Sequence, residues 1–416
     1  MDTYMIQLAL KRAGFDPGPL DGIFGPRTKE AVIAFQKADG LSPDGIVGPL
    51  TRSALARYLR GYSIHRIVRG DTFYRLAREY GTTVRAIVTA NPGLDPKNLI
   101  PAQRVIIPYS FPVVTSEIPY TSALMGYIAD GLRARYPFLR VTIPGRSVMG
   151  RPLWCFSIGS GGTEVFYNAS HHANEWITTP LLMRFLEEYS FAYANKGRIG
   201  GVSANALYMR TTLHLIGMVN PDGVDLVNGA IPTDSGEYRN AQSISKNYPS
   251  VPFPSGWKAN ILGTDLNLNY PAGWEQAREI KFAQGYTSPA PRDYVGSSVL
   301  SEPESRTLYE LTRRSNLALT LSYHTQGEII FWKYLDIEPE GAFDIAEGFA
   351  AASGYAVSDT PYESGFAGYK DFFIQDYGRP GYTIEAGRGS NPLPLSQFPE
   401  IYSDNLGILI LGLQSV

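Results

Sequence analysis

The sequence has little cysteine, little histidine and almost no net charge. One cysteine among 416 residues excludes an internal disulfide, and the apolar neighbours of Cys155 favour a buried small side chain over a nucleophile. A formal net charge of −2, from 37 basic and 39 acidic residues, gives no reason to expect a nucleic-acid partner. No apolar run is long enough to span a membrane, so we expect no membrane partner either.

Only five histidines occur, and one of them follows a short apolar run that is typical of a buried strand. Residues 165–167 form this run, residues 168–170 break it, and a long helical pattern follows from Thr178. His172 and Glu175 lie between strand and helix, so both side chains can reach one point above the sheet edge. An imidazole and a carboxylate are two of the three ligands in a His2Glu zinc site with one open position. A lone His-x-x-Glu pair is more often structural, so the site needs support elsewhere in the chain.

The first sixty residues contain an internal repeat. The segment DGIFGPRT at residues 21–28 returns as DGIVGPLT at residues 44–51, and in each copy a glycine-rich turn leads through proline into a helical pattern. With GFDPG at 14–18 and AVIAFQ at 31–36, this part resembles the peptidoglycan-binding domain family. The resemblance implies a three-helix domain over residues 1–60 that binds peptidoglycan. The repeat by itself equally allows a small bundle without a ligand.

Residues 64–109 form a second small unit with the order strand, helix, helix, strand. Residues 65–69 and 103–108 have strand patterns, Thr72 caps a first helix, and residues 84–90 form a second. This unit resembles the LysM domain, a family that binds polymers containing N-acetylglucosamine. Residues 110–118, which contain Pro112 and are followed by Pro119, are predicted to be a linker. Two unrelated modules with one implied ligand predict a protein delivered to the cell wall.

Residues 119–416 are predicted to form a single large α/β domain. Apolar runs typical of buried strands alternate with helical patterns, which favours a mostly parallel, mixed sheet flanked by helices. We expect helices over 123–136, 178–193, 302–315 and 341–352, and strands over 165–167, 212–218, 317–322 and 381–384. His324 and Glu385 each follow one of these strands, and sites in such folds collect at the carboxyl ends of strands. A carboxylate at that position is costly to bury without a partner, which makes Glu385 hard to explain as purely structural.

These positions resemble the zinc carboxypeptidase family. The family's first signature corresponds to HANEW at 172–176, and the similarity continues through NPDG at 220–223, DLNLN at 265–269, His324 and TIE at 383–385. The resemblance implies that His172, Glu175 and His324 bind Zn2+. It also implies that Glu385 is the general base, and that Asp265 fixes the tautomer of a zinc histidine.

Further resemblances concern the groups that contact substrate. Lys258, in WKAN at 257–260, occupies the place of the arginine that stabilises the oxyanion, although a solvated surface lysine is the alternative. Asn267 and Tyr362 are the nearest matches to substrate-binding residues. Digestive members carry an arginine clamp for the terminal carboxylate where this chain has Leu268, so general exocarboxypeptidase activity is not expected. His171 and His214 are assigned to structure.

Domain order and the missing clamp together resemble the γ-D-glutamyl-L-diamino acid endopeptidases, which cut peptidoglycan stem peptides between D-glutamate and diaminopimelate or lysine. The resemblance implies a stem peptide at the active site and glycan at the N-terminal modules. Charged residues available to recognise the groups beside the scissile bond are Arg151, Arg239, Lys258, Glu363 and Lys370. The sequence starts without the basic head and apolar run of a signal peptide. From the N-terminal modules we expect wall association. Without a recognisable signal peptide, extracellular action and sporulation-related action inside the cell both stay open.

Two alternatives remain at this point. The chain could be a metallocarboxypeptidase of ordinary peptides that carries wall-binding modules. It could also be a non-catalytic adaptor for cell wall or chitin with an inert peptidase domain. The presence of both histidines, Glu175 and Glu385 argues against the adaptor.

Overall fold

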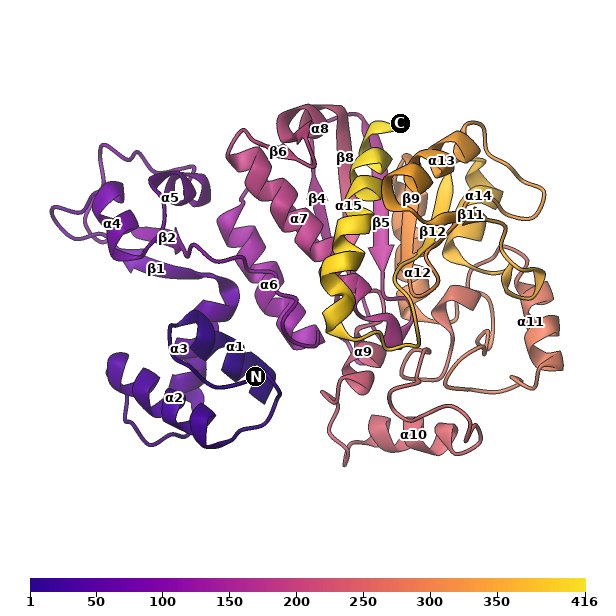
Figure 1. Cartoon of the computed structure of the whole chain (residues 1–416), viewed down its shortest axis with the longest axis horizontal. Coiled ribbons are helices and arrows are strands. Elements are labelled where there is room, and N and C mark those ends of the chain that lie inside the picture. The colour runs from indigo at the N-terminus through magenta and orange to yellow at the C-terminus, as the bar shows by residue number, and fades with distance from the viewer. The chain divides into compact units, whose positions relative to one another are not determined.

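A computed structural model describes residues 1–416 (Figure 1). The chain forms two compact units: Met1–Pro119 with Ala123–Arg140 and Ser190–Asn195, and Tyr120–Ser122 with Val141–Tyr189 and Lys196–Val416. None of the helices has both the length and the apolar character needed to cross a bilayer.

The first unit begins with the three helices α1 (Thr3–Arg12), α2 (Pro26–Ala38) and α3 (Pro49–Arg60). One buried glutamine holds each copy of the repeated turn. The Gln7 Nε2 donates to Asp21 Oδ1 at 3.0 Å, and the Gln36 Nε2 donates to Asp44 Oδ1 at 2.9 Å. The glycine after each aspartate donates its backbone N–H back to the same glutamine at 2.9 Å. The repeat recurs in sequence because each helix fixes the next turn by the same contact.

The strand-helix-helix-strand unit follows as β1 (Tyr62–Arg66), α4 (Phe73–Glu79), α5 (Val84–Ala90) and β2 (Arg104–Pro108), with β1 and β2 antiparallel. Thr72 and Thr83 cap the two helices through their hydroxyl oxygens. The first strand begins and ends about three residues earlier than its sequence pattern predicts. The reason is a turn at Gly70 (φ +90°), in which Val68 N donates to Asp71 Oδ2 at 2.8 Å.

Residues 110–118, predicted to be a linker, are packed within the first compact unit. Val113 and Ile118 are buried, and Arg135 Nη1 donates to Phe111 O at 2.7 Å. Arg135 ends α6 (Ser122–Arg135), whose Asp130 also lies 3.3 Å from Arg60 Nε. Helix α6 therefore contacts residues of the N-terminal modules and belongs to the same compact unit.

The second unit contains an eight-stranded mixed sheet in the order β11-β10-β12-β9-β5-β8-β4-β3. The four central strands β12, β9, β5 and β8 are mutually parallel. Strand β10 runs antiparallel to β12 and parallel to β11, and β4 runs antiparallel to β8. The predicted fold class is confirmed. The strands are β3 (Arg140–Arg146), β4 (Pro152–Ile158), β5 (Thr163–Ala169), β8 (Thr211–Ile216), β9 (Leu317–His324), β10 (Ile329–Phe331), β11 (Ala356–Ser358) and β12 (Gly381–Glu385). A small hairpin, β6 (Arg198–Ile199) with β7 (Val202–Ser203), lies outside this sheet.

Helices cover both faces of the sheet, as the alternation of side chains along β5 requires. Phe166 contacts Tyr369 of α14 at a ring-centroid distance of 5.8 Å. Tyr167 points to the opposite face, where its hydroxyl donates to Leu409 O of α15 at 2.9 Å and its ring lies 6.4 Å from Phe185 of α7. Figure 1 shows α15 lying along the strands beside α13. The helices are α7 (Thr178–Ala194), α8 (Ala204–Arg210), α9 (Pro221–Val227), α10 (Gly236–Ser245), α11 (Trp274–Ala283), α12 (Pro303–Arg314), α13 (Ala342–Ser353), α14 (Tyr369–Tyr377) and α15 (Phe398–Gln414).

The register of the parallel strands sets the position of the site. His324 and Glu385 are direct partners at the ends of β9 and β12. Ala169, at the end of β5, lies level with Tyr323 on β9. The residues that follow β5 therefore emerge beside His324.

Candidate metal centre

The loop after β5 turns sharply and begins the first half of the site. Ser170 adopts a left-handed conformation (φ 55°), and a short 3-10 helix, η1 (Ala173–Glu175), follows His172. Asn220 of the NPDG segment fixes this loop, because its Nδ2 donates to His171 O at 3.1 Å and to Ala259 O at 3.0 Å. Ala173 N donates to Lys258 O at 2.9 Å. The same hydrogen bonds that hold His172 therefore also bring Lys258 to the sheet edge.

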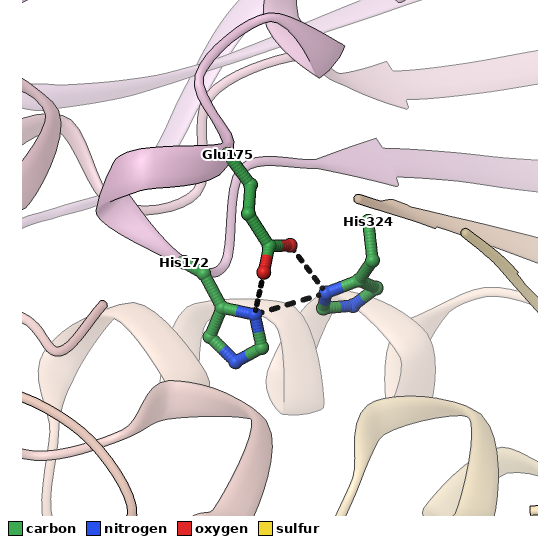
Figure 2. A group of neighbouring side chains, drawn as sticks. All are labelled: His172, Glu175 and His324. Atoms are coloured by element: carbon green, nitrogen blue, oxygen red, sulfur yellow. Dashed lines mark hydrogen bonds and ion pairs between the residues drawn. The ribbon is translucent and has the colours of Figure 1, made fainter. Parts of the chain in front are cut away.

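Two histidines and one glutamate converge at this edge (Figure 2). Nδ1 of His172 lies 2.9 Å from Glu175 Oε1 and 3.2 Å from Nδ1 of His324. Nδ1 of His324 lies 3.1 Å from Glu175 Oε2. All three side chains are buried, and their ligand atoms lie within 4.8 Å of one another.

The donor set fits a zinc ion. His172 Nε2 lies 3.0 Å from Asp265 Oδ1, so in the neutral imidazole this nitrogen carries the proton and Nδ1 is the atom available to a metal ion. The two Nδ1 atoms and the Glu175 carboxylate lie 2.9–3.2 Å from one another in one buried pocket, as ligands of a single cation would. Two imidazoles and one carboxylate form a ligand set of catalytic zinc.

Burial and charge act in opposite directions on the pKa values here. Burial by itself lowers the pKa of His172, but the carboxylates of Glu175 and Asp265 outweigh it and raise this pKa to about 9. Burial raises the pKa of Glu175, and the opposing charges of His172 and Lys258 bring it well below the ordinary value. Burial lowers the pKa of His324. The cluster thus combines an ionised carboxylate with a neutral imidazole and a second imidazole that readily holds a proton.

Two more charged groups border the cluster. Lys258 Nζ lies 3.3 Å from Glu175 Oε1, and its side chain is 20% exposed. Burial by itself lowers the pKa of Lys258, but Glu175 and Asp265 raise it above the ordinary value, so the ammonium stays charged. Glu385 lines the same cleft, which has a volume of about 620 Å³. Burial and the charge of Glu175 raise the pKa of Glu385 to about 8.

Comparison with known proteins agrees with this geometry. The family model described as zinc carboxypeptidase matches residues 127–407, more than half of the chain. The chain belongs to the zinc carboxypeptidase family. It is a zinc metallopeptidase, and His172, Glu175 and His324 are its zinc ligands.

Other comparisons extend along the chain. A peptidoglycan binding domain model matches residues 2–55 of this chain, and a LysM domain model matches residues 65–108. Gamma-D-glutamyl-L-diamino acid endopeptidase 1 of Lysinibacillus sphaericus is 44% identical over 301 residues, covering 72% of this chain and 74% of that protein. Bovine thrombin-activatable fibrinolysis inhibitor, solved with tick carboxypeptidase inhibitor, has a TM-score of 0.56 at 17% identity and covers 72% of this chain and 98% of that chain. Carboxypeptidase A from Helicoverpa armigera has a TM-score of 0.54 at 20% identity, covering 72% and 74%. At such identities the two solved structures establish the fold alone.

The remaining sequence-predicted residues fall into two groups. Asp265, Asn267, Lys258 and Glu385 all line the cleft of this metallopeptidase. Asn267 Oδ1 accepts a hydrogen bond from Tyr369 N at 3.0 Å and so also holds the start of α14. Tyr362 does not line the cleft: it lies in η3 (Tyr362–Ser364), is 59% exposed and packs its ring against Phe366.

The structure also places the two histidines assigned to structure, the single cysteine and the charged residues considered for substrate recognition. His171 Nε2 pairs with Tyr270 Oη at 3.0 Å, and His214 Nδ1 pairs with Ser157 Oγ at 2.9 Å. Cys155 is a free, buried thiol. Of the charged residues considered for substrate recognition, Lys258 and Lys370 line the cleft, whereas Arg151, Arg239 and Glu363 do not.

Sequence reasoning missed several residues around the site. Asn391 Nδ2 donates to Thr325 O at 2.9 Å and approaches Glu175 Oε1 at 3.4 Å. Lys281, Arg292 and Asp293 add three charges to the cleft wall. All except Lys281 come from irregular segments, where no hydrophobic period marks a residue as facing a site.

We expect zinc binding to release a proton near neutral pH. With a pKa of about 9, His172 is protonated at pH 7 before the metal binds, and zinc requires the neutral imidazole. Zinc affinity should therefore rise about tenfold per pH unit between roughly pH 7 and pH 9 and level off above that. Competition with a chelator of known affinity measures this slope. An affinity independent of pH over this range would contradict the charge arrangement, and Asp265→Asn should reduce the slope.

Proposed function

We propose that this zinc metallopeptidase hydrolyses the bond between the γ-carboxyl group of D-glutamate and the diamino acid in peptidoglycan stem peptides. The observation that carries the proposal is the 44% identity, over 301 residues, to an enzyme named for this activity. The matches to peptidoglycan binding and LysM domain models support the same polymer as the partner of the N-terminal modules.

The wall of the cleft supports an internal bond over a free C-terminus. Leu268 lines the cleft at the position where digestive relatives carry the carboxylate-binding arginine. An isobutyl group offers no hydrogen-bond donor to a carboxylate. A plain peptide therefore loses the contact that would hold its C-terminus at this point.

The protein's own side chains supply the proton transfers and the charge stabilisation. Zinc, when bound to His172, Glu175 and His324, supplies a Lewis acid that lowers the pKa of a water molecule towards about 7. Glu385 takes a proton from the attacking water and delivers it to the nitrogen of the leaving diamino acid. The ammonium of Lys258 faces the negative charge that develops on the scissile carbonyl oxygen. Asp265 keeps the proton of His172 on Nε2, which preserves the lone pair on Nδ1.

Asn267 and Tyr362 complete the proposed site as contacts to substrate. Asn267 already lies in the cleft wall. Tyr362 is on an exposed turn beside the cleft, whose wall includes the neighbouring residues Pro361 and Ser364. This position suits a residue that closes over substrate after binding.

The N-terminal modules would hold the enzyme on its polymer. Two weak sites on one chain raise the effective concentration of the catalytic domain at the wall without any new contact at the active site. Helix α6 belongs to the same compact unit as residues 1–119. Truncating the modules would therefore remove residues that α6 contacts, such as Arg60. Wall binding is better tested in the full-length chain with the base removed (Glu385→Gln), by sedimentation with insoluble peptidoglycan and competition by soluble N-acetylglucosamine oligomers.

Mass spectrometry of muropeptide digests tests the proposed activity. The zinc-loaded enzyme should convert stem peptides into one fragment that ends in D-glutamate and another that begins with the diamino acid. Parallel digests of diaminopimelate-type and lysine-type fragments determine the diamino acid. Faster release of single residues from plain peptides would instead identify a metallocarboxypeptidase, and no product from any substrate would identify an adaptor. Chelator-treated protein is the control.

A further inference from the structure

Four cations line the cleft, and three of them are already engaged. Lys258 contacts Glu175 at the zinc site. Lys281 Nζ pairs with Asp293 Oδ1 at 2.8 Å and is 8% exposed. Lys370 Nζ lies 2.5 Å from Asp371 Oδ1, donates to Lys333 O, and is 4% exposed. The fourth cation, Arg292, is the most exposed of them at 44%, and its one partner, Asp293, contacts only Nε.

Arg292 is held in place by its backbone and by one edge of its guanidinium group. Pro291 O accepts hydrogen bonds from the backbone of residues 258 and 259, and Asp265 N donates to Tyr294 O at 2.8 Å. Arg292 Nε donates to Asp293 Oδ2 at 2.5 Å, and Asp293 N donates to Asp265 Oδ2 at 3.2 Å. Neither terminal nitrogen of Arg292 makes a hydrogen bond or ion pair. A guanidinium group fixed through Nε leaves its two terminal nitrogens free for a planar anion.

The position of Arg292 relates it to the scissile bond. Its segment pairs with Lys258, the residue that faces the carbonyl oxygen in the proposed mechanism, and its charge is close enough to oppose that of Lys258. A γ-linked glutamyl residue keeps its α-carboxylate free, three carbons from the scissile carbonyl, and this group is ionised at neutral pH. An α-linked peptide has a carboxylate at that separation only when the residue before the scissile bond is glutamate, whose side-chain carboxylate is also three carbons away. The free carboxylate is present whatever the length of the stem peptide.

We infer that Arg292 binds the free α-carboxylate of the γ-D-glutamyl residue and so selects substrates with an ionised carboxylate at this position. This inference rests on the proposed function. The two terminal nitrogens of Arg292 form the bidentate pair with the carboxylate, while Asp293 and Lys281 keep the guanidinium group oriented. The clamp missing at Leu268 is thus replaced by one on the acyl side of the bond. Stem peptides whose D-glutamate carries an α-carboxamide are poor substrates for such a site.

The test compares two substrates that differ only at this group: L-alanyl-γ-D-glutamyl-diaminopimelate and its α-carboxamide, γ-D-isoglutaminyl analogue. The zinc-loaded wild-type enzyme should prefer the acid. Arg292→Gln should lower kcat/KM for the acid by about 10- to 100-fold, the range of a charge-assisted hydrogen bond, and leave the amide nearly unchanged. The kcat/KM of Arg292→Lys for the acid should lie between those of the wild-type enzyme and Arg292→Gln, because an ammonium supplies charge without the planar pair of donors.

Arg278→Gln is the matched control, since this arginine has the same exposed fraction but does not line the cleft. It should leave both rates unchanged. A wild-type enzyme without preference for the acid, or an Arg292→Gln variant that slows both substrates equally, overturns the role of Arg292 alone. Hydrolysis of neither substrate by the wild-type enzyme overturns the proposed function, and this inference with it. Zinc content and thermal unfolding of each variant separate these outcomes from misfolding.

Discussion

Replacing Glu385 by glutamine should lower kcat/KM by about 10²- to 10⁴-fold and leave the zinc content unchanged, because a general base contributes roughly this factor and Glu385 is not among the three ligands. In the metal-free protein, burial and the charge of Glu175 raise the pKa of Glu385 to about 8. The positive charge of bound zinc favours the ionised form, so the carboxylate is available at neutral pH. The wild-type rate should fall as pH drops through the pKa of Glu385 in the zinc-loaded enzyme, which lies below its value in the metal-free protein, and the residual rate of Glu385→Gln should lack that acid limb.

Kinetics on a soluble γ-D-glutamyl tripeptide, with zinc measured on the same samples, check this result. Glu347→Gln, an exposed glutamate on α13, controls for the loss of one negative charge and should retain full activity. Activity retained in Glu385→Gln would remove the base from the mechanism. Loss of zinc in that variant would mean that Glu385 supports the metal.

The zinc ligands are predictable because position in sequence and position in space are linked at the ends of strands. His324 and Glu385 close neighbouring parallel strands, and their register makes them partners. His172 and Glu175 begin the loop after β5, which emerges at the same edge. Apolar runs locate strands, and a parallel sheet brings their carboxyl ends together. Hydrophobic pattern therefore predicts the four central strands of the sheet and the residues attached directly to them, but not the outer strands β3, β4, β10 and β11.

Residues that reach the site from irregular segments are not predictable in this way. Arg292 enters the cleft because Pro291 and Tyr294 accept hydrogen bonds from residues distant in sequence, and no local pattern encodes that pairing. Tyr362 shows the opposite case, since similarity of sequence spacing suggests a cleft position but the structure places the side chain outside it. Residues 110–118 have the prolines of a linker, yet composition indicates only an extended backbone and does not reveal that Val113 and Ile118 are covered.

Replacing Lys258 by methionine should lower kcat by about 10²- to 10³-fold with a much smaller change in KM, because in the proposed mechanism the ammonium stabilises a negative charge that exists only in the transition state. Its Nζ lies 3.3 Å from Glu175 Oε1, so removing the ammonium takes a positive charge away from the metal site and should not reduce zinc binding.

Lys258→Arg should recover most of the activity, since a guanidinium group supplies the same charge with more donors. Lys246→Met, at an exposed lysine following α10, controls for the charge change and should behave as wild type. A Lys258→Met variant affected mainly in KM would assign Lys258 to ground-state binding. Arg292, whose terminal nitrogens are unpaired in the cleft wall, would then be the candidate for the charge that stabilises the transition state. In that case the double variant Lys258→Met with Arg292→Gln would show the fall in kcat that Lys258→Met alone does not show.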